Sequence, residues 1–247
     1  MSRKYSKPPI VEAVCEFRLT QESKWDLTIP GLIYEEVRKE FPNKEKRQIQ
    51  ELRFSPSQQG VQQPETLTSE LVQFYTNDRK TYIQVGHNLL SVSCLKPYPK
   101  WDGFKPRIKN AFRALIKIVD VIGLERVGLR YINRIEIPSQ SVNLGDYFEF
   151  LPSTGEKLPK DATDFILGCV FPFFNGRDLC KVQLTRAVPE NPVSVAFLLD
   201  LDYYLAQPRS VSASQALEWV EEAHQHVEDI FEGCIKQPLR EIFVEEK

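Results

Sequence analysis

Asp200 and Asp202 are the residues of this sequence whose type and spacing most directly suggest chemistry. Alternate residues of a β-strand point to the same face, so the two carboxylates are expected to lie side by side. One or two carboxylates, completed by water, can hold a hard cation such as Mg²⁺. A metal-dependent phosphodiester or nucleotide reaction is therefore one hypothesis. The competing interpretation is an exposed strand edge, since no third acid stands at a readable spacing.

Other common catalytic arrangements are missing from the sequence. It contains no GxSxG nucleophile motif and neither of the glycine-rich phosphate loops, GxGxxG and GxxxxGK[ST]. A Cys–His pair stays open because cysteines and three histidines (His87, His224 and His226) are present, but no local motif supports it. We therefore assign no catalytic residue and expect no cofactor.

His224 and His226 are close enough in sequence to suggest a metal site. On a helix, however, residues two apart point about 200° away from each other, since each residue turns the chain by about 100°. The pair cannot chelate one ion. His224 falls on an apolar stripe with Val220 and Val227, which favours a core histidine that is hydrogen-bonded to a neighbour.

Charge is distributed unevenly over two segments with helical periodicity. Residues 104–122 carry a basic row, with most members four residues apart, and residues 212–235 carry an acidic one. Both faces can simply be solvated. They can also pair with a partner protein or a second copy, and the basic row can neutralise nucleic-acid phosphates. The basic residues are Lys105, Arg107, Lys109, Arg113 and Lys117, and the acidic ones are Glu218, Glu221, Glu222, Glu228 and Asp229.

The overall composition limits the class of protein. Of the 247 residues, 42% are hydrophobic, which is enough for a sizeable core, and 32 basic against 34 acidic residues give a net charge of −2. No general attraction to nucleic acid or anionic lipid is expected, so such binding needs a local patch. The sequence has no run of about 18 apolar residues and no CxxC pair among its five cysteines. We expect a cytoplasmic protein with reduced thiols and no contact with a membrane.

The candidate residues must be positioned by helices and strands of both kinds. A glutamine- and proline-rich stretch at 55–69 predicts a mobile surface loop. Helical periodicity predicts helices at 29–41, 104–122 and 212–235. Alternating apolar residues predict strands at 10–19, 70–76, 81–86, 89–95, 128–138, 164–174, 179–188 and 193–204.

The order of these elements predicts an α+β fold. In each half of the chain an antiparallel β-meander is followed by a long amphipathic helix, which indicates two α+β halves, residues 1–150 and 151–247. A degenerate duplication would produce this order. The two halves can also form one continuous domain.

The strand GLRYINRIEIP, at residues 128–138, mixes charged and apolar side chains. Its two arginines share one face, while its asparagine lies on the other, apolar face. If the opening strand is its neighbour, two glutamates of that strand would face the arginines in a cross-strand ladder. The asparagine must then find hydrogen-bond partners in the core. With the helix histidine, these structural polar residues are Glu12, Glu16, Arg130, Asn133, Arg134 and His224.

Several short motifs together resemble those of a sporadically distributed bacterial protein family of about this length. They are Pro8, Pro9, Glu12 and Ala13 near the start, residues 129–134, Asp200 and Asp202, and His224 and Phe231 near the end. The resemblance covers nearly the whole chain. The family has no established activity, so the resemblance implies no reaction. Its patchy distribution is similar to that of mobile defence or toxin–antitoxin genes, which implies a defence-associated role.

The sequence favours a non-enzymatic cytoplasmic protein that acts by binding. The expected partner is another protein or a second copy of the chain, in an accessory role within a bacterial defence or toxin–antitoxin-like module. One alternative is a nucleic-acid-binding subunit that uses residues 104–122. A further alternative is a metal-dependent phosphodiester or nucleotide enzyme at Asp200 and Asp202.

Overall fold

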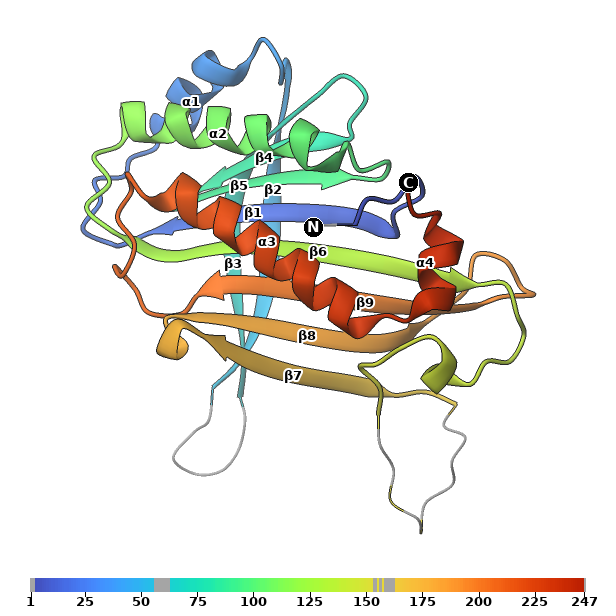
Figure 1. Cartoon of the computed structure of the whole chain (residues 1–247). Coiled ribbons are helices and arrows are strands. Elements are labelled where there is room, and N and C mark those ends of the chain that lie inside the picture. Colours follow the sequence, from blue (N-terminus) through green and yellow to red (C-terminus); the bar gives the residue numbers. More distant parts are fainter. Residues whose placement is uncertain (1–2, 56–62, 153–154, 156, 158–162, 247) are drawn as a thin grey trace.

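The computed structural model describes residues 3–55, 63–152, 155, 157 and 163–246. Its strands form one antiparallel sheet in the order β2-β3-β4-β5-β1-β6-β9-β8-β7 (Figure 1). In chain order they are β1 (Ile10–Leu19), β2 (Asn43–Ser55), β3 (Gln63–Tyr75), β4 (Thr81–Gly86), β5 (Leu89–Leu95), β6 (Leu124–Ile137), β7 (Ile166–Phe173), β8 (Asp178–Ala187) and β9 (Val195–Leu205).

The α-helices of the described residues lie on one face of this sheet (Figure 1). The sheet is amphipathic because alternate residues point to opposite faces. In β1, for example, Ala13, Cys15 and Phe17 are buried toward the helices, while the residues between them are half-buried on the open face. The helices are α1 (Ile29–Val37), α2 (Lys100–Ile118), α3 (Ala216–Cys234) and α4 (Gln237–Phe243).

The expected α+β fold with antiparallel strands is confirmed. Each of the two 19-residue helices follows a meander: β3, β4 and β5 precede α2, and β7, β8 and β9 precede α3. β6 pairs with both β1 and β9, so both groups of strands belong to a single sheet. Part of the segment around the expected boundary at 150/151 lies outside the described residues.

The helix expected at 104–122 begins and ends earlier than the sequence indicates. α2 starts at Lys100, and Val119 is already extended, with φ −107° and ψ 130°. Ile122 therefore lies beyond the helix and is 56% exposed instead of joining its apolar stripe. The apolar residues Phe104, Ile108, Ala111, Phe112 and Leu115 form the buried stripe of the helix, and the ring of Phe112 stacks on Phe17 of β1 at 4.3 Å between centroids.

Strand β2 was not predicted from the sequence, because charged residues dominate its start. Lys44, Glu45, Lys46 and Arg47 follow one another where an alternating apolar pattern would be expected. This strand is held by pairing with β3 along its whole length. Of the loop expected at 55–69, residues 56–62 lie outside the described residues, whereas residues 63–69 belong to strand β3, so the prediction of a loop is wrong there.

The described residues contain no helix that is long and apolar enough to cross a membrane.

Candidate functional site

The strand that carries the two candidate arginines lies at the centre of the sheet. β6 pairs with β1, as the sequence suggested, but the arginines take other partners than Glu12 and Glu16. Arg130 forms a two-pronged bond to Asp200, with N–O distances of 2.8 and 2.6 Å. Arg134 binds Glu136 and Glu190 instead. The prediction that the arginines pair with Glu12 and Glu16 is wrong. Arg130 lies opposite Val14 of β1 and not opposite either glutamate.

Arg126 was not among the candidate residues. On the open face of the sheet it links Glu16 of β1 to Asp202 of β9. Its guanidinium lies 3.0 Å from Glu16 and binds both carboxylate oxygens of Asp202 at 2.8 and 2.9 Å. Glu12 instead accepts a hydrogen bond from Tyr82 at 2.6 Å. The spacing of Arg126 could have identified it from the sequence, because it lies four residues before Arg130 and therefore on the same strand face.

Asp200 and Asp202 do share a strand face, but both carboxylates are already engaged by arginine. A cation at this place would have to displace Arg126 and Arg130 from charge-assisted hydrogen bonds. Among the described residues, no group of three His, Cys, Asp or Glu side chains is arranged to hold a metal ion. The geometry thus gives the pair a structural use.

The basic row on α2 is largely neutralised by other helices. Lys117 binds Glu36 of α1 at 2.8 Å, and Arg107 binds Glu40 just after α1, also at 2.8 Å. Lys105 binds Glu221 of α3 at 2.5 Å. Among the described residues, Lys109 and Arg113 have no ion-pair partner, so two of the five basic side chains remain available to another molecule.

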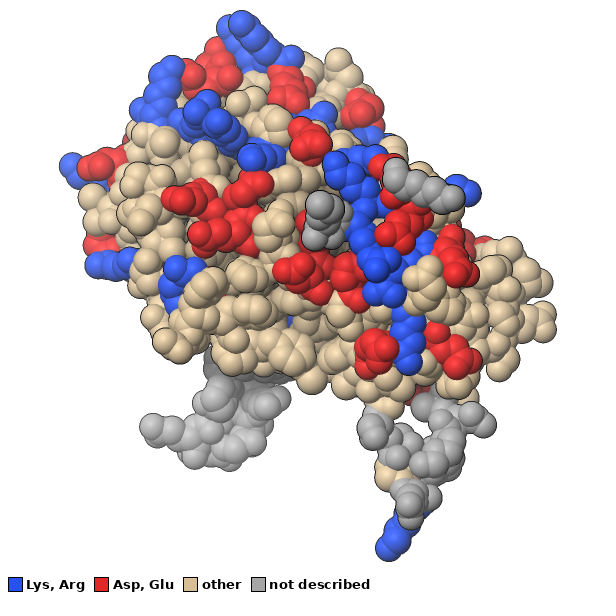
Figure 2. All heavy atoms as spheres, viewed as in Figure 1, with Lys and Arg blue, Asp and Glu red and all other residues tan. Residues whose placement is uncertain are grey.

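The acidic row on α3 is divided in the same way. Glu221 is bound to Lys105 and accepts a hydrogen bond from the Trp101 indole, while Glu228 lies 3.2 Å from His224. Burial alone would raise the pKa of Glu221, but the bonds from Lys105 and Trp101 lower it below its ordinary value. Figure 2 shows basic side chains gathered over α1 and α2 and acidic ones over α3. The exposed members of this acidic row are Glu218, Glu222 and Asp229.

The outer edge of β7 is the most apolar exposed region. Ile166 is 80% and Val170 53% exposed on this strand, and Phe171 and the neighbouring Phe174 are also exposed. No charged residue occurs in the strand sequence ILGCVFPF. Edge strands usually carry charges that discourage pairing with another chain, as β2 does at the opposite end of this sheet. β7 lacks that protection.

The backbone of β7 presents groups outward at alternate residues, and no backbone group of the described residues pairs with them. Pro172 has no N–H, so its pair with Leu179 of β8 must be one of the non-hydrogen-bonded pairs of the ladder. The residues in step with Pro172 direct their N–H and C=O groups to the open edge. These are Ile166, Gly168 and Val170. A side chain added at Gly168 would meet nothing within 4 Å.

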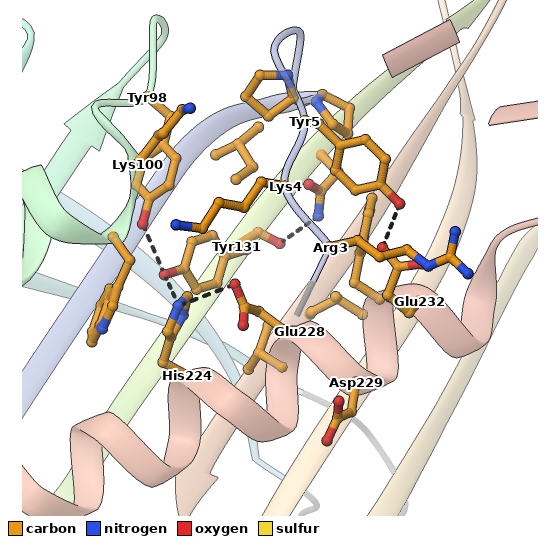
Figure 3. A pocket seen from close by; sticks show the side chains of 18 of the residues that line it. Arg3, Lys4, Tyr5, Tyr98, Lys100, Tyr131, His224, Glu228, Asp229 and Glu232 are labelled. Atoms are coloured by element: carbon orange, nitrogen blue, oxygen red, sulfur yellow. Dashed lines mark hydrogen bonds and ion pairs between the residues drawn. The ribbon is translucent and has the colours of Figure 1, made fainter. Parts of the chain in front are cut away.

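A cavity of about 440 Å³ lies under the N-terminal segment, between the start of α2, the middle of β6 and the last turns of α3 (Figure 3). The residues that line the cavity are far apart in the sequence, as Tyr5, Trp101 and Phe231 illustrate. Six residues of the short motifs noted in the sequence meet there: Pro8, Pro9, Tyr131, Asn133, His224 and Phe231.

The cavity contains a chain of hydrogen-bonded polar side chains, visible in Figure 3. Tyr98 and Tyr131 hydroxyl oxygens are 3.1 Å apart, the Tyr131 oxygen is 3.2 Å from His224 Nδ1, and His224 Nε2 is 3.2 Å from Glu228. His224 is only 5% exposed, and the Trp101 ring stacks on it at 4.0 Å between centroids. The histidine thus lies in the core with polar neighbours on both ring nitrogens.

This chain has the order of a nucleophile–histidine–carboxylate triad, but its tyrosine is not activated. Burial raises the pKa of Tyr131 well above its ordinary value, and burial also raises that of Tyr98. Both hydroxyls therefore keep their protons near neutral pH, and a phenolate nucleophile is disfavoured. The arrangement is suited to hydrogen bonding of a guest more than to covalent catalysis.

Asn133 lies beside the chain and is 2% exposed. Its amide Nδ2 donates to the backbone carbonyl of Leu199 at 3.1 Å and approaches that of Tyr131 at 3.5 Å. Tyr98, Trp101 and Tyr131 were missed as site residues, because aromatic residues in amphipathic segments look like ordinary core. The polar interruptions at Asn133 and His224 pointed to this place in the sequence.

Comparison of the sequence with protein-family models and with curated proteins finds no match.

Proposed function

We propose that this protein is a non-enzymatic binding protein that associates with a second copy of itself through the edge of β7. The observation that carries the proposal is an uncharged edge strand with Ile166 and Val170 exposed and with alternate backbone groups unpaired. An exposed apolar strand edge of this kind is a template for pairing with another strand.

The edge is self-complementary in one register. If two β7 strands pair antiparallel about Gly168, Ile166 of each copy lies opposite Val170 of the other. All three outward residues then form hydrogen-bonded pairs across the interface, and two cross-strand pairs of β-branched side chains form on one face. Gly168 faces its own counterpart, where the absence of side chains avoids a clash.

A second copy is the occupant that fits these features best. Antiparallel pairing of identical strands gives a closed two-fold dimer, which uses up both open edges at once. Because β7 carries no charge, two copies meet without like-charge repulsion. The other sheet edge, β2, begins with four consecutive charged residues and is a poorer template.

The experiment compares Val170→Lys with Val193→Lys by light scattering coupled to size exclusion. Both valines are 53% exposed, but Val193 lies in the loop between β8 and β9, away from the paired edge. We expect the unaltered protein and Val193→Lys to be dimers and Val170→Lys to be monomeric. Each lysine at position 170 would place a charge opposite Ile166 of the other copy. A monomeric parent protein, or a dimer that survives Val170→Lys, would sink the proposal.

The other hypotheses from the sequence receive less support. Nucleic-acid binding by α2 would rely on Lys109 and Arg113, since Lys105, Arg107 and Lys117 are bound to acids. A metal-dependent reaction at Asp200 and Asp202 would have to compete with two arginines.

The wider setting of the protein is also a proposal. We propose a cytoplasmic accessory component of a bacterial defence or toxin–antitoxin-like module, on the strength of the family resemblance. We further propose that residues 1–150 and 151–247 derive from a degenerate duplication. In each half an antiparallel meander is followed by a 19-residue helix, β2 to β5 before α2 and β7 to β9 before α3, and this order supports such an origin.

A further inference from the structure

The cavity beneath the N-terminal segment has features of a site for a small molecule. We infer that it binds a primary organic amine in its protonated form, with the ammonium group at the Tyr98 hydroxyl and an apolar body along the wall. At about 440 Å³ the cavity has the volume of ordinary ligand sites. This inference concerns a different surface from the β7 edge and does not depend on self-association.

The hydrogen-bonded chain leaves acceptors, not donors, facing the cavity. When His224 is neutral, its Nε2–H donates to the Glu228 carboxylate, and Nδ1 is then the acceptor for the Tyr131 hydroxyl. Tyr131 then accepts from the hydroxyl of Tyr98. Every proton of the chain is used within it, and the lone pairs of the Tyr98 oxygen are left for a guest that donates.

Asn133 adds a second acceptor. Its Nδ2 is directed at the carbonyls of Leu199 and Tyr131, which fixes the orientation of the amide. Its Oδ1 accepts no hydrogen bond from the described residues and belongs to a side chain that lines the cavity. A buried amide oxygen of this kind favours a ligand with N–H groups.

The charges around the cavity favour a cation. Its lining contains four carboxylates against three basic side chains. Two of those basic residues, Arg3 and Lys100, are bound to Glu245 and Glu246, and one of the carboxylates, Glu232, is bound to Arg240. These three partners lie outside the lining and add two negative charges and one positive charge. The local potential is thus more negative than the lining alone suggests. An anionic ligand would meet repulsion here.

The walls supply the surface for an apolar body. Tyr98, Trp101, Tyr131 and Phe231 line the cavity together with Leu201. Aromatic faces attract an ammonium group, and apolar walls favour the hydrocarbon attached to it. A quaternary ammonium could use the rings but not the acceptors at Tyr98 and Asn133, which is why the inference is a primary amine.

The test measures binding of phenethylamine by calorimetry at pH 7 and low salt, beside two analogues of the same shape. 2-Phenylethanol has no charge, and 3-phenylpropionate has the opposite charge. We expect the amine to bind at least about tenfold more tightly than the alcohol and the carboxylate not to bind, because only the amine is both a cation and a multiple donor. Equal binding of the three compounds, preference for the carboxylate or no binding of the amine would overturn the inference.

Two variants locate the site. Tyr98→Phe keeps the ring but removes the acceptor and should weaken amine binding about tenfold, whereas Tyr82→Phe removes a hydroxyl that binds Glu12 on the opposite face and should leave it unchanged. Lys4→Glu changes an exposed residue at the cavity and should tighten binding several-fold, with little risk to folding. Unchanged affinity in both Tyr98→Phe and Lys4→Glu would contradict the assignment.

Discussion

At the scale of single residues, Asp178 is the side chain on which the most contacts converge. It is fully buried and accepts hydrogen bonds from the Trp219 indole at 3.1 Å, the Tyr203 hydroxyl at 3.2 Å and Arg177 at 2.7 Å. These donors come from α3, β9 and the turn before β8. A buried carboxylate with three donors is stable only while all of them are in place.

Removing this carboxylate should therefore be costly. We expect Asp178→Ala to lower the free energy of unfolding by about 2–4 kcal/mol, because two buried donors and the arginine lose their acceptor. Urea denaturation measures the change, with Asp229→Ala as the control. Asp229 is exposed on α3, and its substitution should change stability by less than about 0.5 kcal/mol. Similar losses in both variants would contradict the role given to Asp178.

The same scale shows where sequence reasoning fails for polar residues. The sequence around Asp178 gives no signal of this role, because the residue ends the turn-forming segment NGRD directly before a strand. Its importance depends on Trp219 and Tyr203, whose approach is decided by the packing of α3 on β9. By contrast, Asn133 could be flagged from the sequence, because a polar residue at an apolar strand position must have partners nearby.

At the scale of elements, the exposure of the cysteine side chains differs between the edge strand β7 and the interior of the fold. Cys15, Cys94, Cys180 and Cys234 are buried, and Cys169 on β7 is partly exposed. Burial raises the pKa of Cys180 and of Cys234 to about 12, and it also raises the pKa of Cys15 and of Cys94. Thiolate is the reactive form, so these four thiols are nearly inert near neutral pH.

We expect one fast-reacting thiol per chain when the native protein is titrated with a chromogenic disulfide reagent at pH 8. The fast thiol should be Cys169 and should vanish in Cys169→Ser, while the other four react only as the protein unfolds. Any fast thiol that remains in Cys169→Ser would mean that the sheet opens elsewhere, against the burial described for β1, β5, β8 and the end of α3.

Elements were also the level at which the sequence predicted most. The apolar stripe of α2 and the alternation in β1 follow directly from helical and strand periodicity, and both are found. β2 was missed because its charged start hides the alternation. The opposite charges of α2 and α3 were read as outward faces, whereas Lys105–Glu221 shows that the two helices also bind each other.

At the scale of the whole molecule, strand order decides which residues meet. The first strand lies between β5 and β6, far from its neighbours in sequence, and this places the N-terminal segment over the cavity (Figures 1 and 3). Periodicity cannot reveal such pairing, because it is decided by non-local contacts. The cavity, which joins residues from Arg3 to Glu232, could not be assembled from sequence for that reason.

The central claim is that two copies join along β7 in a register centred on Gly168, and cysteine cross-linking tests this most directly. Gly168→Cys in a Cys169→Ser background places two thiols opposite each other, at a Cα separation of about 5.5 Å in a hydrogen-bonded pair, within reach of a disulfide. Ile166→Cys in the same background is the matched control, since its counterpart would lie about 13 Å away along the strand.

Under mild oxidation, we predict a disulfide-linked dimer for Gly168→Cys and monomeric chains for Ile166→Cys on a non-reducing gel. Equal cross-linking of the two variants, or none in Gly168→Cys, would contradict the account.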